Sequence, residues 1–103
     1  MREGCTIIFA DRPLSRMKGL LGTKAQEYAD THLVIRPCRA IHTIGMRYPL
    51  DVAFFDSQGI VLASHRGVRA SRILVGPRST AGVVERPAHR GIWYGRGDVV
   101  EGI

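Results

Sequence analysis

The residues best suited to chemistry gather in the run from Ile41 to Gly59, IHTIGMRYPLDVAFFDSQG. His42 and Asp51 lie in this run, and Glu85 follows further along the chain. A carboxylate beside an imidazole fixes its tautomer and raises its basicity, which a general base requires. One hypothesis is therefore an enzyme with His42 as general acid or base, oriented by Asp51 or Glu85.

A structural interpretation of the same residues is also open. His42 and Thr43 would then anchor a loop, while Asp51 pairs with an arginine, because satisfied polar networks stabilise many small folds. Glu85 could likewise form a buried ion pair with Arg16. The arginines considered for Asp51 are Arg16, Arg39 and Arg47.

Cys38, His42 and Met46 are spaced four residues apart and offer thiolate, imidazole and thioether ligands of the kind that copper prefers. That spacing aligns side chains on a helix, but Gly45 and the β-branched neighbours argue against a helix here. A cysteine and a methionine more often fill a core. We therefore expect no metal and no other cofactor.

Several familiar activities lack their motifs. The chain has no G-x-S-x-G elbow, no G-x-x-x-x-G-K-[ST] phosphate loop and no dinucleotide fingerprint. Cys38 and His42 also lie too close in sequence for a typical cysteine-protease pairing. Nucleophilic hydrolysis and nucleotide-dependent chemistry are therefore not expected.

The charge of the chain is strongly basic, with a formal net charge of +6 and arginine in all but two of its 15 basic positions. Arg66, Arg69 and Arg72 recur every three residues and could contact a polyanion such as nucleic acid. Base-stacking aromatic residues are not interleaved with them, so a solvated basic loop is the alternative. Arginine also recognises the carboxylates of peptides and small anions.

The surroundings of the chain are predicted from what it lacks. Cys5 and Cys38 have no metal-finger or redox spacing, and no segment approaches the roughly eighteen apolar residues that span a bilayer. The first residues show no signal-peptide pattern. We therefore expect a cytoplasmic protein without a membrane span.

Alternation predicts a hairpin over residues 50–64. Leu50, Val52 and Phe54 alternate with their neighbours at a period of two, and the turn residues DSQG separate this run from the apolar run IVLA. Both faces of the first strand are apolar, so we expect it to be central in its sheet. Ala40 to Met46 is expected to be an irregular segment leading into it.

The other expected elements are short. Strands are expected over residues 5–10, 33–35, 73–75, 81–85 and 98–103, and polar loops over 23–30 and 65–72. Leu14, Met17, Leu20 and Leu21 are spaced for one amphipathic helix. The 103 residues are enough for a single domain, residues 1–103. We expect a mainly β (α+β) fold, a compact β-barrel or β-sandwich with this helix near its start.

Four short motifs follow one another along the chain. They are Arg16-x-x-Gly19-Leu20-Leu21, His42-Thr43-x-Gly45-Met46-x-x-Pro49-Leu50-Asp51-Val52-x-Phe54-x-Asp56, Val84-Glu85-x-Pro87-Ala88 and Gly97-Asp98. Together they resemble the Domain of Unknown Function 192 family over nearly the whole chain, and HTxGMxxPLD is the specific part. The resemblance implies a small, mainly β domain with one early helix and no assigned activity. Leu21 and His89 depart from the family's usual methionine and glycine.

The leading functional hypothesis is a ligand-binding or accessory module with a cleft around the HTxGMxxPLD stretch. The arginines favour an anionic small molecule or peptide as its ligand. An enzyme centred on His42, and a basic adaptor for nucleic acid or a protein complex, are the alternatives. The expected ligand-binding residues are Arg16, His42, Thr43, Met46, Asp51 and Glu85.

Overall fold

The computed structural model describes residues 6–10 and 31–102, and this part of the chain is built from β-strands. Their bounds are β1 Thr6–Ala10, β2 Thr31–Ile35, β3 Ala40–His42, β4 Leu50–Phe55, β5 Val61–Val68, β6 Ile73–Val75 and β7 Gly82–Pro87. The mainly β prediction is confirmed. The predicted helix over residues 14–21 and the predicted loop over 23–30 lie outside the described residues.

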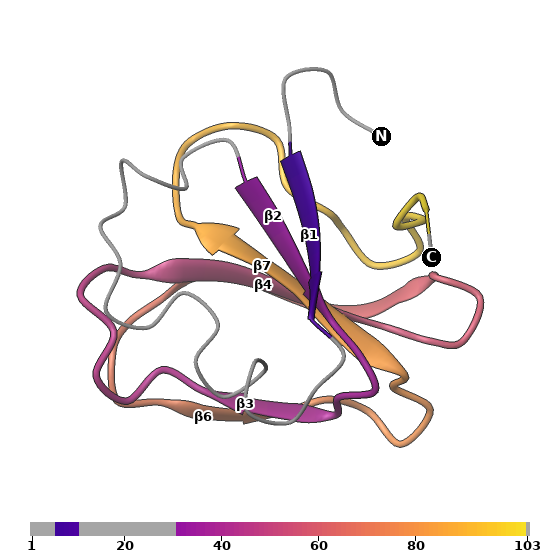
Figure 1. Ribbon diagram of the computed structural model, residues 1–103, viewed down its shortest axis with the longest axis horizontal. Helices are drawn as coiled ribbons and strands as arrows, with labels where there is room; N and C mark the ends of the chain where they lie inside the picture. Colours follow the sequence, from indigo (N-terminus) through magenta and orange to yellow (C-terminus); the bar gives the residue numbers. More distant parts are fainter. Residues whose placement is uncertain (1–5, 11–30, 103) are drawn as a thin grey trace.

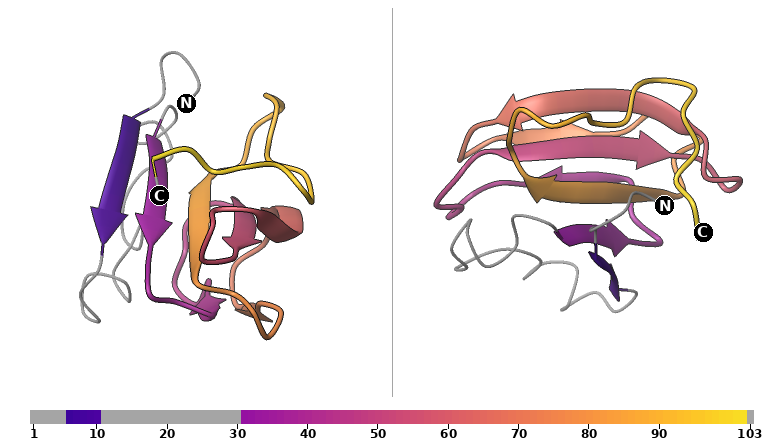
Figure 2. Two further views of the ribbon diagram at one scale, coloured as in Figure 1. Left: turned by 90° about the vertical axis from the view of Figure 1, so that its right-hand side faces the viewer. Right: turned by 90° about the horizontal axis from the view of Figure 1, so that it is seen from above.

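Five of the strands form one sheet in the order β1-β2-β7-β4-β5 (Figure 1). β1 pairs with β2 in parallel, and the remaining pairs are antiparallel. β1 and β5 lie at opposite edges of this sheet, so the described strands form an open sheet and the expected barrel is not supported (Figure 2). The central position expected for residues 50–55 is confirmed, because β4 lies between β7 and β5.

The β4–β5 hairpin forms as the alternating pattern predicts. Asp56 closes its turn by accepting hydrogen bonds at Oδ1 from the backbone N–H groups of Gln58 (2.9 Å) and Ile60 (3.0 Å). Gly59 has a φ of 81°, a conformation that glycine adopts without a Cβ clash. β5 continues to Val68, so the segment expected as a basic loop is partly strand.

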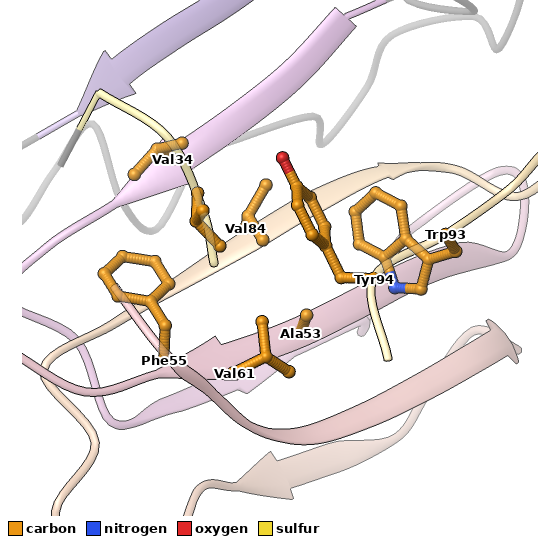
Figure 3. Packing of buried hydrophobic residues seen from close by; sticks show 8 residues of the cluster. Val34, Ala53, Phe55, Val61, Val84, Trp93 and Tyr94 are labelled. Atoms are coloured by element: carbon orange, nitrogen blue, oxygen red, sulfur yellow. The ribbon is translucent and has the colours of Figure 1, made fainter. Parts of the chain in front are cut away.

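One face of the large sheet packs against the C-terminal segment. Trp93, Tyr94 and Val100 from that segment cover the sheet residues of this cluster (Figure 3). The sheet residues are Val34, Ala53, Phe55, Val61 and Val84. The strand predicted over residues 98–103 is wrong, because the described part of it forms only an isolated bridge between Ile60 and Val99.

The opposite face packs against a two-stranded ribbon of β3 and β6, which lies beneath the large sheet in Figure 1. Ile41 and Leu74 lie opposite each other in the ribbon and pack on the apolar cluster of this face. The cluster comprises Leu33, Ile35, Leu50, Val52, Phe54 and Val83. β3 was expected to be irregular, and its three residues are too few to show a period-two pattern.

Candidate functional site

His42 lies on the outer face of the β3–β6 ribbon and is exposed to solvent. It is paired in register with Ile73 of β6, while Ile41 beside it is directed toward the core. Among the described residues, no hydrogen bond or ion pair involves its imidazole. The ring is therefore accessible, and no described carboxylate orients it.

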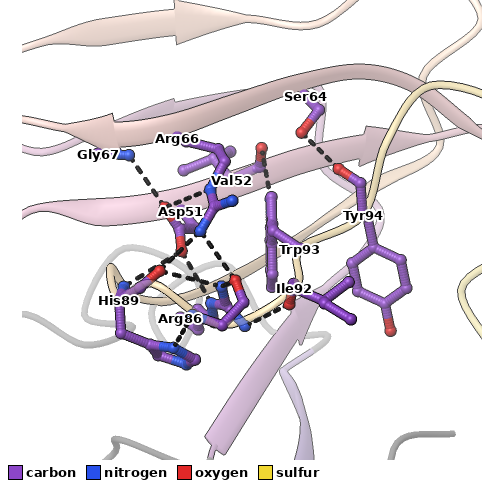
Figure 4. A network of polar contacts seen from close by, with 11 residues as sticks. Asp51, Val52, Ser64, Arg66, Gly67, Arg86, His89, Ile92, Trp93 and Tyr94 are labelled. Atoms are coloured by element: carbon purple, nitrogen blue, oxygen red, sulfur yellow. Dashed lines mark hydrogen bonds and ion pairs between the residues drawn. The ribbon is translucent and has the colours of Figure 1, made fainter.

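Asp51 is buried on β4, on the face covered by the C-terminal segment, and both oxygens of its carboxylate accept hydrogen bonds. Its Oδ2 accepts a 2.8 Å hydrogen bond from Nε of Arg86, which is itself buried. Its Oδ1 accepts a 3.0 Å bond from the N–H of Gly67 and lies 3.9 Å from Nε of Arg66 (Figure 4). Asp51 therefore pairs with Arg86 and Arg66, and not with His42, Arg39 or Arg47.

Arg86 fixes the loop after β7 as well as Asp51. Its guanidinium donates to the carbonyl oxygens of Gly91 and Ile92, both at 2.9 Å, and lies 4.6 Å from the centre of the Trp93 ring. This role of Arg86 was not predicted from the sequence. The signal was the charged pair Glu85 and Arg86 within the strand GVVERP: side chains of adjacent strand residues point to opposite faces, so a buried Arg86 requires an anionic partner other than Glu85.

The buried aromatic pair Trp93 and Tyr94 belongs to the core on this face. Nε1 of Trp93 donates to the carbonyl oxygen of Val52 at 3.3 Å. Buried His32 meets Trp93 edge-on, with 5.3 Å between ring centres, and Tyr94 at 5.8 Å. These aromatic residues attach the C-terminal segment to the sheet.

Glu85 is directed to the other face of the sheet. It is paired in register with Leu33 and Val52, and successive strand residues alternate between faces, so it lies opposite to Arg86 and Asp51. Burial raises the pKa of Glu85 from 4.5 to about 7. Asp51 and Glu85 therefore do not converge, and no described residue forms a hydrogen bond or ion pair with the Glu85 carboxylate.

Thr43 is a buried anchor between two loops. Its hydroxyl donates to the carbonyl oxygen of Arg69 at 2.7 Å and accepts from the N–H of Arg72 at 2.9 Å. Its N–H also donates to the carbonyl oxygen of Arg72 at 2.8 Å. This geometry agrees with the interpretation of Thr43 as a structural anchor, and its predicted ligand contact stays a prediction.

Replacing Thr43 by valine should lower the free energy of unfolding by about 1 to 3 kcal/mol, because the N–H of Arg72 and the carbonyl oxygen of Arg69 lose a partly buried hydrogen-bond partner. Thr43→Ser keeps the hydroxyl and should cost less. Urea denaturation of both variants measures the difference. Equal stability of Thr43→Val and the parent would contradict the anchor.

Cys38 and Met46 pack against the apolar cluster between the large sheet and the ribbon, whereas His42 is on the ribbon's outer face. The Cys38 thiol donates to the carbonyl oxygen of Ala40 at 3.1 Å. Within residues 6–10 and 31–102, no group of three or more His, Cys, Asp and Glu side chains could hold a metal ion. The set Cys38, His42 and Met46 thus has its members on different faces.

The three arginines predicted to contact polyanions differ in their environment. Arg66 donates to the carbonyl oxygens of His89 (2.7 Å) and Gly91 (2.9 Å), so its side chain supports the same loop as Arg86. Arg69 and Arg72 are exposed beside β6. Arg16 lies outside the described residues.

The β3–β6 ribbon and its flanking loops have an unusual charge. Residues 37–50 and 69–81, which we call the basic ribbon, contain no aspartate or glutamate. Its arginines, all exposed, are Arg39, Arg47, Arg69, Arg72 and Arg78. Ile44, Ile73 and Val75 are also exposed on it, the last two by 71% and 64%. The basic ribbon thus combines positive charge with exposed apolar side chains.

Comparison with known proteins identifies the family but no activity. The model of the Domain of Unknown Function 192 family, described as an uncharacterised ACR, matches residues 2–92. No curated protein matches the chain.

Two solved structures are similar in fold. One, from Sinorhizobium meliloti, is named as a candidate transcription regulator. Its TM-score is 0.69 and its sequence identity is 23%, and the match covers 82% of this chain and 69% of that one. The other is a protein of unknown function from Novosphingobium aromaticivorans, with a TM-score of 0.66 at 15% identity, over 80% of this chain and 62% of that one. This chain thus spans less than two thirds of the second protein.

In the described part of the chain, no helix is long and apolar enough to cross a membrane.

Proposed function

Since this chain belongs to the Domain of Unknown Function 192 family, whose description assigns no activity, we propose a function from the chain's own residues. The protein acts as a binding module that recognises an anionic partner through the basic ribbon. The observation that carries the proposal is the separation of charge. Five exposed arginines lie on residues 37–50 and 69–81, where the sequence has no acidic residue.

The remaining charges support the same proposal. Nine arginines are exposed in the described part of the chain, but only three of its acidic side chains are not buried. Two of these three, Asp56 and Asp98, accept hydrogen bonds from neighbouring backbone N–H groups. An anionic partner therefore meets little opposing charge, which favours both attraction and rapid association.

The exposed position of His42 favours binding over catalysis. A general base needs a partner that fixes its tautomer. Asp51 pairs with Arg86, and Glu85 is buried on the opposite face of the large sheet from Asp51, so neither orients His42. On the outer face of the ribbon, at the end of β3, His42 adds a hydrogen-bond donor. The enzyme hypothesis receives no comparable support from these contacts.

Nucleic acid is the second candidate partner. It is favoured by the name of the Sinorhizobium meliloti structure and by the exposed arginines. Against it, Trp93 and Tyr94 are buried, so they are not available to stack on bases.

The proposal predicts that an oligoglutamate peptide of about ten residues binds the protein and loses affinity as salt rises from about 50 to 200 mM. The Arg47→Gln/Arg72→Gln variant should bind it about tenfold more weakly, because two charges leave the basic ribbon. Fluorescence anisotropy measures both effects.

The matched control is Arg90→Gln/Arg96→Gln, which removes the same charge from exposed positions outside the ribbon. Its affinity should change by less than about twofold. Equal losses in the two variants would show a general charge effect and reject the ribbon as the site. Tighter binding of a single-stranded oligonucleotide of equal charge would favour the second candidate.

A further inference from the structure

Within residues 6–10 and 31–102, one edge of β6 pairs with no other strand. The N–H of Gly76 donates to the carbonyl oxygen of Arg39 at 2.7 Å, and the carbonyl of Arg72 accepts from Thr43 at 2.8 Å. In an antiparallel ladder, residues that bond to the partner strand alternate with residues whose backbone groups are directed away. The backbone N–H and C=O groups of residues 72, 74 and 76 are therefore directed toward β3. Those of Ile73 and Val75 are directed to the outer edge.

The side chains at this edge are unusual for an exposed strand. Ile73 and Val75 are apolar, β-branched and largely exposed. Edge strands are commonly protected by lysine, proline or inward-pointing charge, because an unprotected edge pairs with other chains. β6 has none of these within Ile73–Val75, although it is short.

We propose that the outer edge of β6 binds an extended segment of a partner protein by strand addition. The partner segment carries apolar residues at alternate positions, next to Ile73 and Val75, and acidic residues at its ends. Main-chain hydrogen bonds supply affinity in this type of recognition, and alternate side chains supply specificity. The inference rests on the proposed function and specifies its partner and its binding mode.

Charge complementarity favours an acidic peptide over a second copy of this chain as the binding partner at this edge. Arg69, Arg72 and Arg78 flank β6, and no acidic residue lies between Ser57 and Val84. A second copy of this chain would bring the same arginines against each other, and like charges in juxtaposition oppose association. An acidic peptide is attracted by the same arginines.

The test uses a synthetic peptide of about nine residues, with valine at alternate positions, threonine between them and glutamate at both ends. N-methylation of alternate residues blocks the N–H groups along one edge of the bound strand. Methylation of one alternate set should weaken binding at least about tenfold, and methylation of the other set less than about twofold. Isothermal titration calorimetry measures the affinities.

A second test changes the protein. Val75→Pro removes an N–H that faces the outer edge without removing a bond to β3, and proline is tolerated at such positions. It should weaken binding of the unmethylated peptide at least about tenfold, while Val75→Thr, which keeps the N–H and the β-branched shape, should retain most of it. Circular dichroism checks that each variant folds.

The outcomes separate this inference from the proposed function. Equal effects of the two methylated sets would overturn strand addition, and if Arg47→Gln/Arg72→Gln still weakened binding, the proposed function would stand. Loss of peptide binding in the control Arg90→Gln/Arg96→Gln to the same extent would overturn both.

Discussion

Replacing Glu85 by glutamine should stabilise the protein by about 3 kcal/mol above about pH 8 and leave its stability almost unchanged below about pH 4. The reason is the cost of ionising a carboxyl group that is buried on the face of the large sheet covered by the β3–β6 ribbon. Its pKa is raised from 4.5 to about 7, so the folded protein binds this proton more tightly than the unfolded chain does. Glutamine has almost the same shape and carries no charge.

The sign of the pH dependence follows from that difference. Below about pH 4.5 the group is protonated in both states and the stability is fully present. As the pH rises from about 4.5 to about 7, the unfolded chain has released its proton while the folded protein still holds it, so the free energy of unfolding falls until the pH passes about 7. Urea denaturation across this range should show the fall in the parent and its absence in Glu85→Gln.

Asp98→Asn provides the control, because Asp98 is exposed and the asparagine oxygen can still accept the hydrogen bond from the N–H of Gly95. It should leave the pH profile of stability close to that of the parent. If Glu85→Gln were instead less stable than the parent at pH 8, the carboxylate would be stabilised by a cation, as the predicted ion pair with Arg16 requires.

Replacing Asp51 by asparagine should lower the free energy of unfolding by about 3 to 5 kcal/mol, because it leaves the buried Arg86 guanidinium without its counter-charge. Asp51 and Arg86 are almost fully enclosed, with side-chain exposures of 1% and 3%. The loop after β7 should loosen as well, since Arg86 supports the carbonyls of Gly91 and Ile92. Denaturation and amide hydrogen exchange of residues 89–92 measure the two effects.

Arg66→Gln removes the other arginine near Asp51 and serves as the comparison. Its side chain is 51% exposed and lies 3.9 Å from the carboxylate, so it should cost only about 1 kcal/mol. Equal costs for the two variants would contradict the assignment of the buried pair to Arg86.

The β4–β5 hairpin could be predicted because its signals are local. Val52 and Phe54 alternate with neighbours on the other face, and Asp56 and Gly59 provide the turn. The strand pairing of β2 with β7 is long-range and depends on the whole chain. No local pattern indicates which distant strands become neighbours.

The candidate site was harder to predict for the same reason. Asp51 and Arg86 are 35 residues apart and meet only because β4 and β7 pair in that register. The same register directs Glu85 to the opposite face, which separates two carboxylates that appear equivalent in the sequence. The strand over residues 73–75 could be predicted, but the exposure of Ile73 and Val75 could not, because β6 is one strand of a narrow ribbon and exposes one of its faces.

The most direct test of the proposed function is an NMR titration of the isotope-labelled protein with the oligoglutamate peptide. The proposal predicts that amide chemical-shift changes concentrate in residues 37–50 and 69–81, and that they diminish when the salt concentration is raised. Changes concentrated in residues 89–97, or spread evenly over all exposed arginines, would contradict it.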